Sequence, residues 1–470
     1  MGQNASIAGT PGGSAGGVEG FFHLREHGTT VRTEVLAGIT TFFVMAYIIA
    51  VNPSILSAAG LDIRAVATST CLVAGVLSIL MGLYTNRAFA LAPGLGLNAI
   101  VAFNLVGTLG LTPAEAMGVV VAEGILILVL VLLGVRKYVM DVVPASLSRA
   151  IAVGIGFFIL FIGLRNAGVI TFVPGQTGTI DGFLTLTPLD TWPIFVAMVG
   201  LLITVVLMAR KVRAAILLGI LISTVVAFLV PGEVATMPAQ PFAGPDFSLV
   251  GQFTFGFVAK LGLLTAVLVV ISFMLSDFFD TMGTLIGVGA EAGYLNDKGE
   301  LEDSQKPLLV DSLGAIGGGL VSASSATTYI ESAAGVAAGG RTGLVAVVTG
   351  VLFLLALPFV ALVGAIPTVA TAPALIVVGV LMVGVLSEGA AGKRERIDFG
   401  NLEEALPVVL TMLVMPLTFS ITNGIGAGFV SYVVIKVASG KAREVHPALY
   451  VIAGLFLLYF LRWAVFDAQF

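Results

Sequence analysis

Residues 260–289 read KLGLLTAVLVVISFMLSDFFDTMGTLIGVG. From Leu261 the stretch is apolar for long enough to enter a lipid bilayer, whose hydrocarbon core takes about 20 residues to cross as a helix. Asp277 and Asp280 interrupt it three residues apart, and such residues share one face of a helix. A carboxylate inside a membrane usually faces a protein interior or a water-filled cavity. The stretch predicts a membrane helix with functional acids; the alternative is that Asp280 caps a helix end or that both acids lie at the interface.

Composition indicates a polytopic membrane protein. Hydrophobic residues make up 58% of the 470 and charged residues 10%, whereas soluble domains carry about 25% charged residues. Mean hydropathy is +1.08. The 58 glycines fit membrane helices whose backbones approach closely. The net charge of -5 gives no reason to expect a nucleic-acid partner.

Apolar stretches recur along the chain after a Gly-, Ser- and Ala-rich start, residues 1–20, which predicts a disordered tail. They predict fourteen or fifteen membrane segments, depending on whether the last one crosses. The stretches cover residues 35–58, 64–84, 95–109, 114–134, 147–164, 192–209, 214–230, 261–289, 308–321, 328–338, 344–363, 370–386, 402–420, 424–438 and 449–465. Before the eighth, residues 246–257 intersperse four Phe with polar residues and Gly and predict an interfacial segment.

Basic residues predict the orientation, because Lys and Arg are retained in cytoplasmic loops. With a cytoplasmic N-terminus, the basic clusters fall before the first segment or after even-numbered ones. Loops 171–191 and 232–252 contain no Lys or Arg and are predicted to lie outside. The expected location is the cell (plasma) membrane, crossed many times.

Two short segments are broken at corresponding places in the two halves of the chain. Residues 89–98 read FALAPGLGLN, and residues 321–332 read VSASSATTYIES. Each is an extended piece of small residues that leads into a half-helix. Matched breaks point to an inverted repeat with a binding site at its centre, where unpaired backbone groups face a cavity. Asn98 and Glu331 are the polar residues near each break; the alternative is a pair of kinked packing helices.

Several motifs together carry a family resemblance. Residues 27–34 (HGTTVRTE), 37–43 (AGITTFF) and 46–53 (AYIIAVNP) resemble the opening of the purine permeases. These form the adenine, guanine and hypoxanthine branch of the nucleobase:cation symporter family, which also holds the xanthine and uracil permeases. Residues 92–98 (APGLGLN), 277–284 (DFFDTMGT) and 324–332 (SSATTYIES) match the same branch.

The resemblance implies an all-α membrane fold of about fourteen segments in two inverted seven-segment repeats, with short antiparallel strands in segments three and ten that meet at the substrate site. It also implies a core domain and a gate domain, each in two parts. The core would comprise residues 21–140 (segments 1–4) and 246–365 (segments 8–11). The gate would comprise residues 141–245 (segments 5–7) and 366–470 (segments 12–14 and the last apolar stretch).

The chain departs from the wider family in three ways. Uracil and xanthine relatives carry a glutamate in segment eight, where this chain has Asp277. The three histidines, His23, His27 and His446, lie near predicted cytoplasmic ends, so a histidine proton relay is not expected and the purine branch is favoured. The apolar stretch after Pro447 exceeds the fourteen-segment scheme.

The residues near the breaks suit a neutral ring with N–H donors, because carboxylates accept charge-assisted hydrogen bonds from such donors. No Lys or Arg is close to them in sequence, which disfavours an anion as substrate. We expect Glu331 to be the main purine-binding acid, with Asp277 sharing the task. The predicted substrate-binding residues are Asn98, Asp277, Glu331, Phe278, Thr328 and Tyr329, of which Phe278 and Tyr329 could stack on a base.

Proton coupling is assigned to Asp280 as carrier or orienting residue and to Glu123, near the middle of segment four. An alternative for Glu123 is a structural hydrogen bond. Asp311 and Arg165 are predicted to be interfacial. No cofactor or metal is expected; the coupling ion is the proton. The expected partners are a purine nucleobase and the bilayer, with a homodimer left open and no nucleic acid.

The predicted function is therefore purine uptake by proton symport with alternating access. A first alternative is a transporter of the same fold for another solute, such as xanthine, uracil or a small anion. A second is a channel or a membrane-embedded enzyme. An enzyme would need a nucleophile with its base or a set of metal ligands, and the lone Cys71 and the peripheral histidines do not supply one.

Overall fold

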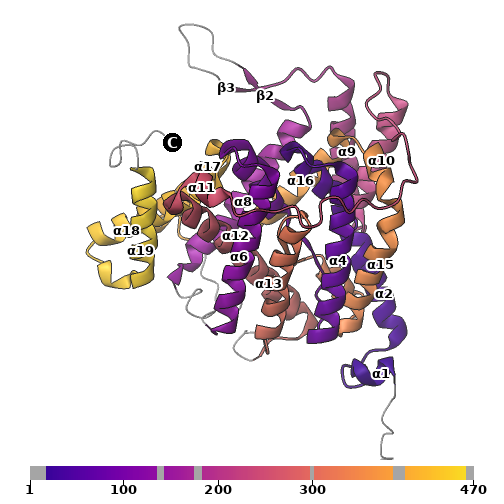
Figure 1. Cartoon of the computed structure of the whole chain (residues 1–470), viewed down its shortest axis with the longest axis horizontal. Coiled ribbons are helices and arrows are strands. Elements are labelled where there is room, and N and C mark those ends of the chain that lie inside the picture. Colours follow the sequence, from indigo (N-terminus) through magenta and orange to yellow (C-terminus); the bar gives the residue numbers. More distant parts are fainter. Residues whose placement is uncertain (1–16, 135–141, 174–182, 297–300, 385–396, 462–470) are drawn as a thin grey trace, which may run out of the picture.

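The computed structural model describes residues 17–134, 142–173, 183–296, 301–384 and 397–461, which form a largely helical body (Figure 1). In the first half the helices are α1 (Val18–Phe21), α2 (Val31–Met45), α3 (Ile48–Leu56), α4 (Ile63–Thr85), α5 (Leu95–Ala99), the π-helix η2 (Ile100–Thr108), α6 (Pro113–Leu132), α8 (Ala145–Asn166), α9 (Trp192–Ala209) and α10 (Ala215–Leu229). In the second half they are α11 (Phe257–Leu261), α12 (Leu263–Ala292), α13 (Gln305–Leu320), α14 (Ser332–Ala337), α15 (Gly343–Ala356) with the 3₁₀ helix η3 (Leu357–Ala365), α16 (Thr368–Val383), α17 (Leu402–Thr418), α18 (Ile421–Ala438) and α19 (Pro447–Phe460).

Every apolar stretch predicted as a segment coincides with a helix or with a strand that runs into a half-helix. Among the described residues, eight helical runs of at least 18 residues are apolar enough to cross a membrane. The described part of the last stretch forms α19, whose 14 residues rise about 21 Å; residues 462–465 of the stretch lie outside the described residues, and whether it crosses the membrane stays a prediction. Most of the predicted N-terminal tail lies outside the described residues, and its last residues enter α1.

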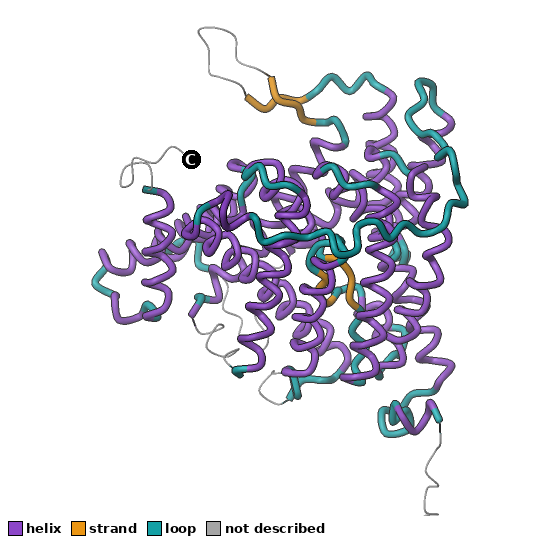
Figure 2. Tube along the Cα trace, viewed as in Figure 1, coloured by secondary structure: helices purple, strands orange, loops and turns teal. Residues whose placement is uncertain are grey.

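Two three-residue strands lie in the middle of the body, and a second strand pair, β2 (Ile170–Val173) with β3 (Phe183–Leu186), projects at one end (Figure 2). The central strands β1 (Leu91–Pro93) and β4 (Ala326–Thr328) come from the two broken segments and pair antiparallel, with Ala92 opposite Thr327. This confirms the strand pairing that the family resemblance implied.

Every backbone polar group inside a bilayer needs a hydrogen-bond partner. On the outer edges of these strands, side chains of the preceding helices provide partners for the backbone N–H groups. On β1, the Leu91 N–H donates to Ser78 Oγ of α4 at 2.9 Å. On β4, the Thr328 N–H donates to Asp311 Oδ1 of α13 at 2.9 Å. α4 and α13 precede β1 and β4, so the two halves cover their strands in the same way.

The remaining helices pack in two groups. In one group α2 and α4 pack on α15, and α6 packs on α12 and α13. In the other, α8 packs on α16 and α17, and α9 packs on α10. The division into a core domain and a gate domain stays a prediction.

A long connection from α10 to α11 crosses the front of the body (Figures 1 and 2). We call its second part, residues 246–256, the strap. Asp246 forms an ion pair with Arg64 of α4 at 3.0 Å, and hydrogen bonds from Ser248, assisted by Arg64, lower the pKa of Asp246. The Gly251 N–H donates to the Leu320 carbonyl of α13 at 2.7 Å. The strap is therefore fastened to the first helix group.

The contact between α13 and the turn before β4 leaves no space for a side chain at Gly318. A methyl there would lie 1.9 Å from the Ser324 carbonyl oxygen, whereas one at Gly317 would meet nothing within 4 Å. We expect Gly318→Ala to destabilise the protein by about 1–3 kcal/mol, as forced overpacking does. Gly317→Ala is the matched control and should be neutral or slightly stabilising. Thermal unfolding of the purified variants in detergent measures the difference; equal melting temperatures would contradict this packing.

Candidate functional site

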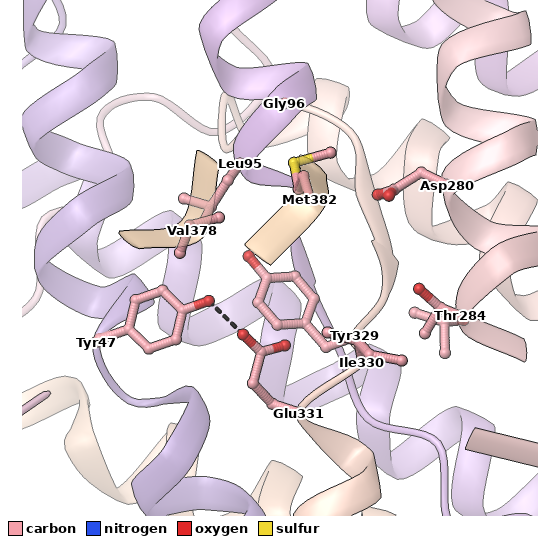
Figure 3. Close-up of a pocket in the computed structure, with 12 residues that line it drawn as sticks. Tyr47, Leu95, Gly96, Asp280, Thr284, Tyr329, Ile330, Glu331, Val378 and Met382 are labelled. Atoms are coloured by element: carbon pink, nitrogen blue, oxygen red, sulfur yellow. Dashed lines mark hydrogen bonds between the residues drawn. The ribbon is translucent and has the colours of Figure 1, made fainter. Parts of the chain in front are cut away.

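A cavity of about 90 Å³ lies where the paired strands meet α12 and α16. Both halves of the chain and both helix groups contribute to its wall (Figure 3). The lining residues are Tyr47, Gly94, Leu95, Gly96, Asp280, Thr284, Thr328, Tyr329, Ile330, Glu331, Val378 and Met382. This is the central position that the matched chain breaks predicted.

Glu331 sits at the N-cap of half-helix α14, with its carboxyl on the cavity. The Tyr47 hydroxyl donates a hydrogen bond of 2.5 Å to Glu331 Oε1 (Figure 3). Tyr47 is fully buried in the short junction between α2 and α3. Tyr47 lies within one of the family motifs but is not among the predicted site residues. The hydrogen bond fixes the orientation of the acid.

Asp280 lines the cavity from α12, on the other side of the Tyr329 ring in Figure 3. Thr284 follows one turn later on the same face and also lines it. The cavity thus has one carboxylate from α12 and one from the junction between β4 and α14. The sequence predicts a role in proton coupling for Asp280 and not one in substrate binding.

Asp277, by contrast, is fully buried and absent from the cavity lining. The Ser325 hydroxyl donates to Asp277 Oδ2 at 2.6 Å, and the Thr281 hydroxyl lies 3.5 Å from Oδ1. Asp277 therefore faces the start of β4. This placement does not support direct contact between Asp277 and a ligand in the cavity.

The prediction that Asp311 is interfacial is wrong. Its side chain is 3% exposed, and α13 begins at Gln305, so Asp311 lies well inside the helix. Besides the Thr328 N–H, its carboxylate accepts hydrogen bonds from the hydroxyls of Thr281 at 2.7 Å and Thr328 at 3.0 Å. Asp311 holds β4 against α12 and α13. Arg165 is exposed near the end of α8, and its place at the membrane interface stays a prediction.

Glu123 of α6 completes a cluster of acids behind β4. It is fully buried, and neither carboxyl oxygen has a hydrogen-bond partner of good geometry in the described structure. It lies close enough to Asp277 and Asp311 for the charge on each to act on the others. Asp277 and Ser325 lie close enough to Glu123 for a hydrogen bond of looser geometry, so the roles in proton coupling and in a structural hydrogen bond both stay predictions.

Among the described residues, no basic side chain forms an ion pair with these acids. In the described part of the chain, every ion pair involves other carboxylates. A buried charge without a partner is costly. The two carboxyl groups on the cavity and the three acids behind β4 are therefore suited to accept protons or hydrogen bonds. They are unsuited to bind an anion.

Of the other predicted binding residues, two line the cavity and two do not. Thr328 and Tyr329 line the cavity, and the Tyr329 hydroxyl donates to the Pro93 carbonyl, which ties its ring to β1. Phe278 is buried and packs edge-on against Phe279. Asn98 of α5 is fully buried off the cavity lining, and both polar atoms of its side chain lack a partner among the described residues.

Comparison with known proteins places this arrangement among permeases. The permease family model Xan_ur_permease matches residues 32–425. The chain is 40% identical over 448 residues to the adenine permease AdeP of Escherichia coli K12, covering 94% of this chain and 96% of that one. It is 40% identical over 445 residues to the guanine/hypoxanthine permease PbuO of Bacillus subtilis 168, covering 93% and 99%.

A solved structure shares the fold. The transmembrane domain of the cyanobacterial bicarbonate transporter BicA aligns with a TM-score of 0.61 at 18% identity, covering 84% of this chain and 97% of that one. This chain accordingly has the fold of seven-plus-seven segments in inverted repeats.

Proposed function

Because this chain belongs to the permease family Xan_ur_permease, we propose that it transports purine nucleobases across the membrane by proton symport with alternating access. The family is one of nucleobase transporters, and the relatives most similar in sequence include adenine and guanine/hypoxanthine permeases. One observation carries the proposal: Glu331, oriented by Tyr47, and Asp280 both face one central cavity that has no cation in its lining.

The cavity lining is rich in hydrogen-bond acceptors. Two carboxylates and the hydroxyls of Thr284 and Thr328 can accept from ring N–H and exocyclic amine groups. The Tyr329 ring offers a flat apolar surface for a planar base. A site built for such hydrogen bonds rejects analogues that lack the donors. The same lining disfavours a small anion, although the bicarbonate transporter shares the fold.

We assign the coupling proton to the Glu123–Asp277 pair. Asp311 already accepts hydrogen bonds from three residues and Asp277 from two, whereas neither oxygen of Glu123 has a hydrogen-bond partner of good geometry in the described structure. Burial disfavours two adjacent negative charges. The Glu123–Asp277 pair, whose oxygens have few hydrogen-bond donors, is therefore the most favourable place for a proton. This keeps the predicted role of Glu123 and exchanges the roles predicted for Asp277 and Asp280.

The strand β4 provides the link between proton and substrate. Ser325, just before β4, bonds Asp277, while Thr328 and Tyr329 at its other end line the cavity. A change of protonation at Asp277 alters what holds the strand, and so alters the cavity wall. Val378 and Met382 of α16 close the cavity from the second helix group, so movement of one group against the other would open it.

Uptake into proteoliposomes tests this function. We expect an imposed inward proton gradient to drive uphill accumulation of labelled adenine or hypoxanthine. Unlabelled purines should compete, and uracil and bicarbonate should not. Competition by uracil or bicarbonate but not by purines would favour a transporter of the same fold for another solute. Accumulation driven by sodium alone would refute the proton coupling and leave the purine site standing.

A further inference from the structure

We propose that bound water molecules form a proton path inside the first helix group, from beneath the strap to the Glu123–Asp277 pair, separate from the purine cavity. The path would pass Ser69, Asn52 and Ser324. The inference rests on the proposed proton symport and adds the route by which the proton reaches its site.

Unsatisfied buried polar atoms mark the route. Asn52 Oδ1, Ser69 Oγ, Ser324 Oγ and both carboxyl oxygens of Glu123 have no hydrogen-bond partner in the described structure. All four side chains are at most 1% exposed. Buried polar atoms in folded proteins almost always have a partner, and where the protein supplies none the partner is ordered water. These atoms therefore indicate water sites within the packed helices.

The inner part of the route runs from Asn52 to the segment before β4. Its side-chain amide donates to the Ala323 carbonyl at 3.1 Å and to Thr70 Oγ1 at 2.8 Å. Ser324 and Ser325 follow directly, and Ser325 donates to Asp277. Ala323 and Ser325 are two residues apart, so their Cα atoms lie within about 7 Å of each other. Asn52 thus lies one short step from the acid pair.

The outer part of the route ends under the strap. Thr68, next to Ser69 on α4, accepts a hydrogen bond from the Asp246 N–H at 2.9 Å. Ser322, two residues before Ser324, donates to strap carbonyls at Leu249 and Gln252. Thr68 and Ser322 therefore both contact the strap, whose Asp246 carboxylate is partly exposed. The distribution of basic residues predicts that this face lies outside the cell.

The backbone before β4 is strained at two residues of this polar segment. Ser322 and Ser324 have φ of 57° and 72°, values that non-glycine residues rarely adopt and that cost on the order of 1–3 kcal/mol each. Such strain concentrates at functional sites. None of the residues on the route lines the purine cavity. A proton could thus reach Asp277 without passing the bound base.

Serine substitutions on the route test it without removing any hydrogen bond within the protein. In Ser324→Ala and Ser69→Val, the lost hydroxyl has no protein partner, and Val adds a methyl group that blocks water. We expect equilibrium purine binding and purine counterflow to change by less than about twofold, and uptake driven by a proton gradient to fall about tenfold, since ordered waters would be lost.

Ser272→Ala is the matched control. Ser272 is as deeply buried, on α12, but its hydroxyl donates to the Leu268 carbonyl within its own helix. We expect this variant to keep gradient-driven uptake. If the two route variants accumulate purine as Ser272→Ala does, the path is refuted. Should one route variant lose purine binding, the other still decides. If the unmodified protein binds purine but shows no response to a proton gradient, the proposed coupling fails before the route is at issue.

Discussion

Glu331→Gln should weaken purine binding about 100-fold. The substitution keeps the size of the side chain and removes the charge that strengthens hydrogen bonds from ring N–H groups, each worth about 1.5–3 kcal/mol when charge-assisted. Tyr47 donates to this carboxylate, so an amide that turns its NH₂ toward Tyr47 also disturbs the orientation of the group. Equilibrium binding of labelled adenine and hypoxanthine to purified protein measures the loss.

Two further variants make the result specific. Tyr47→Phe keeps the carboxylate and removes the hydrogen bond that orients it, and we expect a smaller loss of about tenfold, near the lower end of the range for one hydrogen bond to a charged group. Glu115→Gln is a control at a distant acid, where Glu115 forms a capping box with Thr112 at the start of α6. It should bind purine normally. Normal binding by Glu331→Gln would remove the central acid from the substrate site.

Asp277→Asn and Asp280→Asn should have opposite effects. Asp277 bonds β4 and lies off the cavity, so we expect Asp277→Asn to bind and exchange purine while losing uphill accumulation. Asp280 lines the cavity, so Asp280→Asn should weaken binding by about tenfold or more, the cost of one charge-assisted hydrogen bond. Proteoliposome uptake with and without a proton gradient, set beside equilibrium binding, separates the two effects.

The reverse outcome would restore the roles that the sequence suggested. If Asp280→Asn binds normally and loses only accumulation, Asp280 is the proton carrier. If Asp277→Asn loses binding, the base must reach deeper than the cavity described. The two variants serve as controls for each other, because they make the same chemical change one turn apart on α12.

The arrangement of segments was predictable because each has a strong local signal. Long apolar runs identify the helices, and the two breaks at residues 89–98 and 321–332 identify where the repeats meet. The antiparallel pairing of the breaks came from the family resemblance and not from the residues themselves. Glu331, Thr328 and Tyr329 were predicted to be near the ligand, and the structure places them on the cavity wall.

The division of labour among the acids could not be predicted from the sequence. Residues three apart on a helix point about 60° from each other, which is enough for Asp280 to face the cavity while Asp277 faces β4. Asp311 was misplaced because its helix begins with polar residues, which hide the true start at Gln305. Tyr47 was missed because it lies in an apolar run where the end of α2 has no Gly or Pro nearby.

The pairing of β1 with β4 has a consequence for how the chain is made. Leu91 and Thr328 are opposite each other in the fold, yet the ribosome adds them roughly ten to fifty seconds apart at common rates of synthesis. Throughout that interval the side of β1 that faces β4 has no partner strand. Because unpaired backbone polar groups are costly in hydrocarbon, we expect the third segment to settle in lipid only after the tenth has emerged.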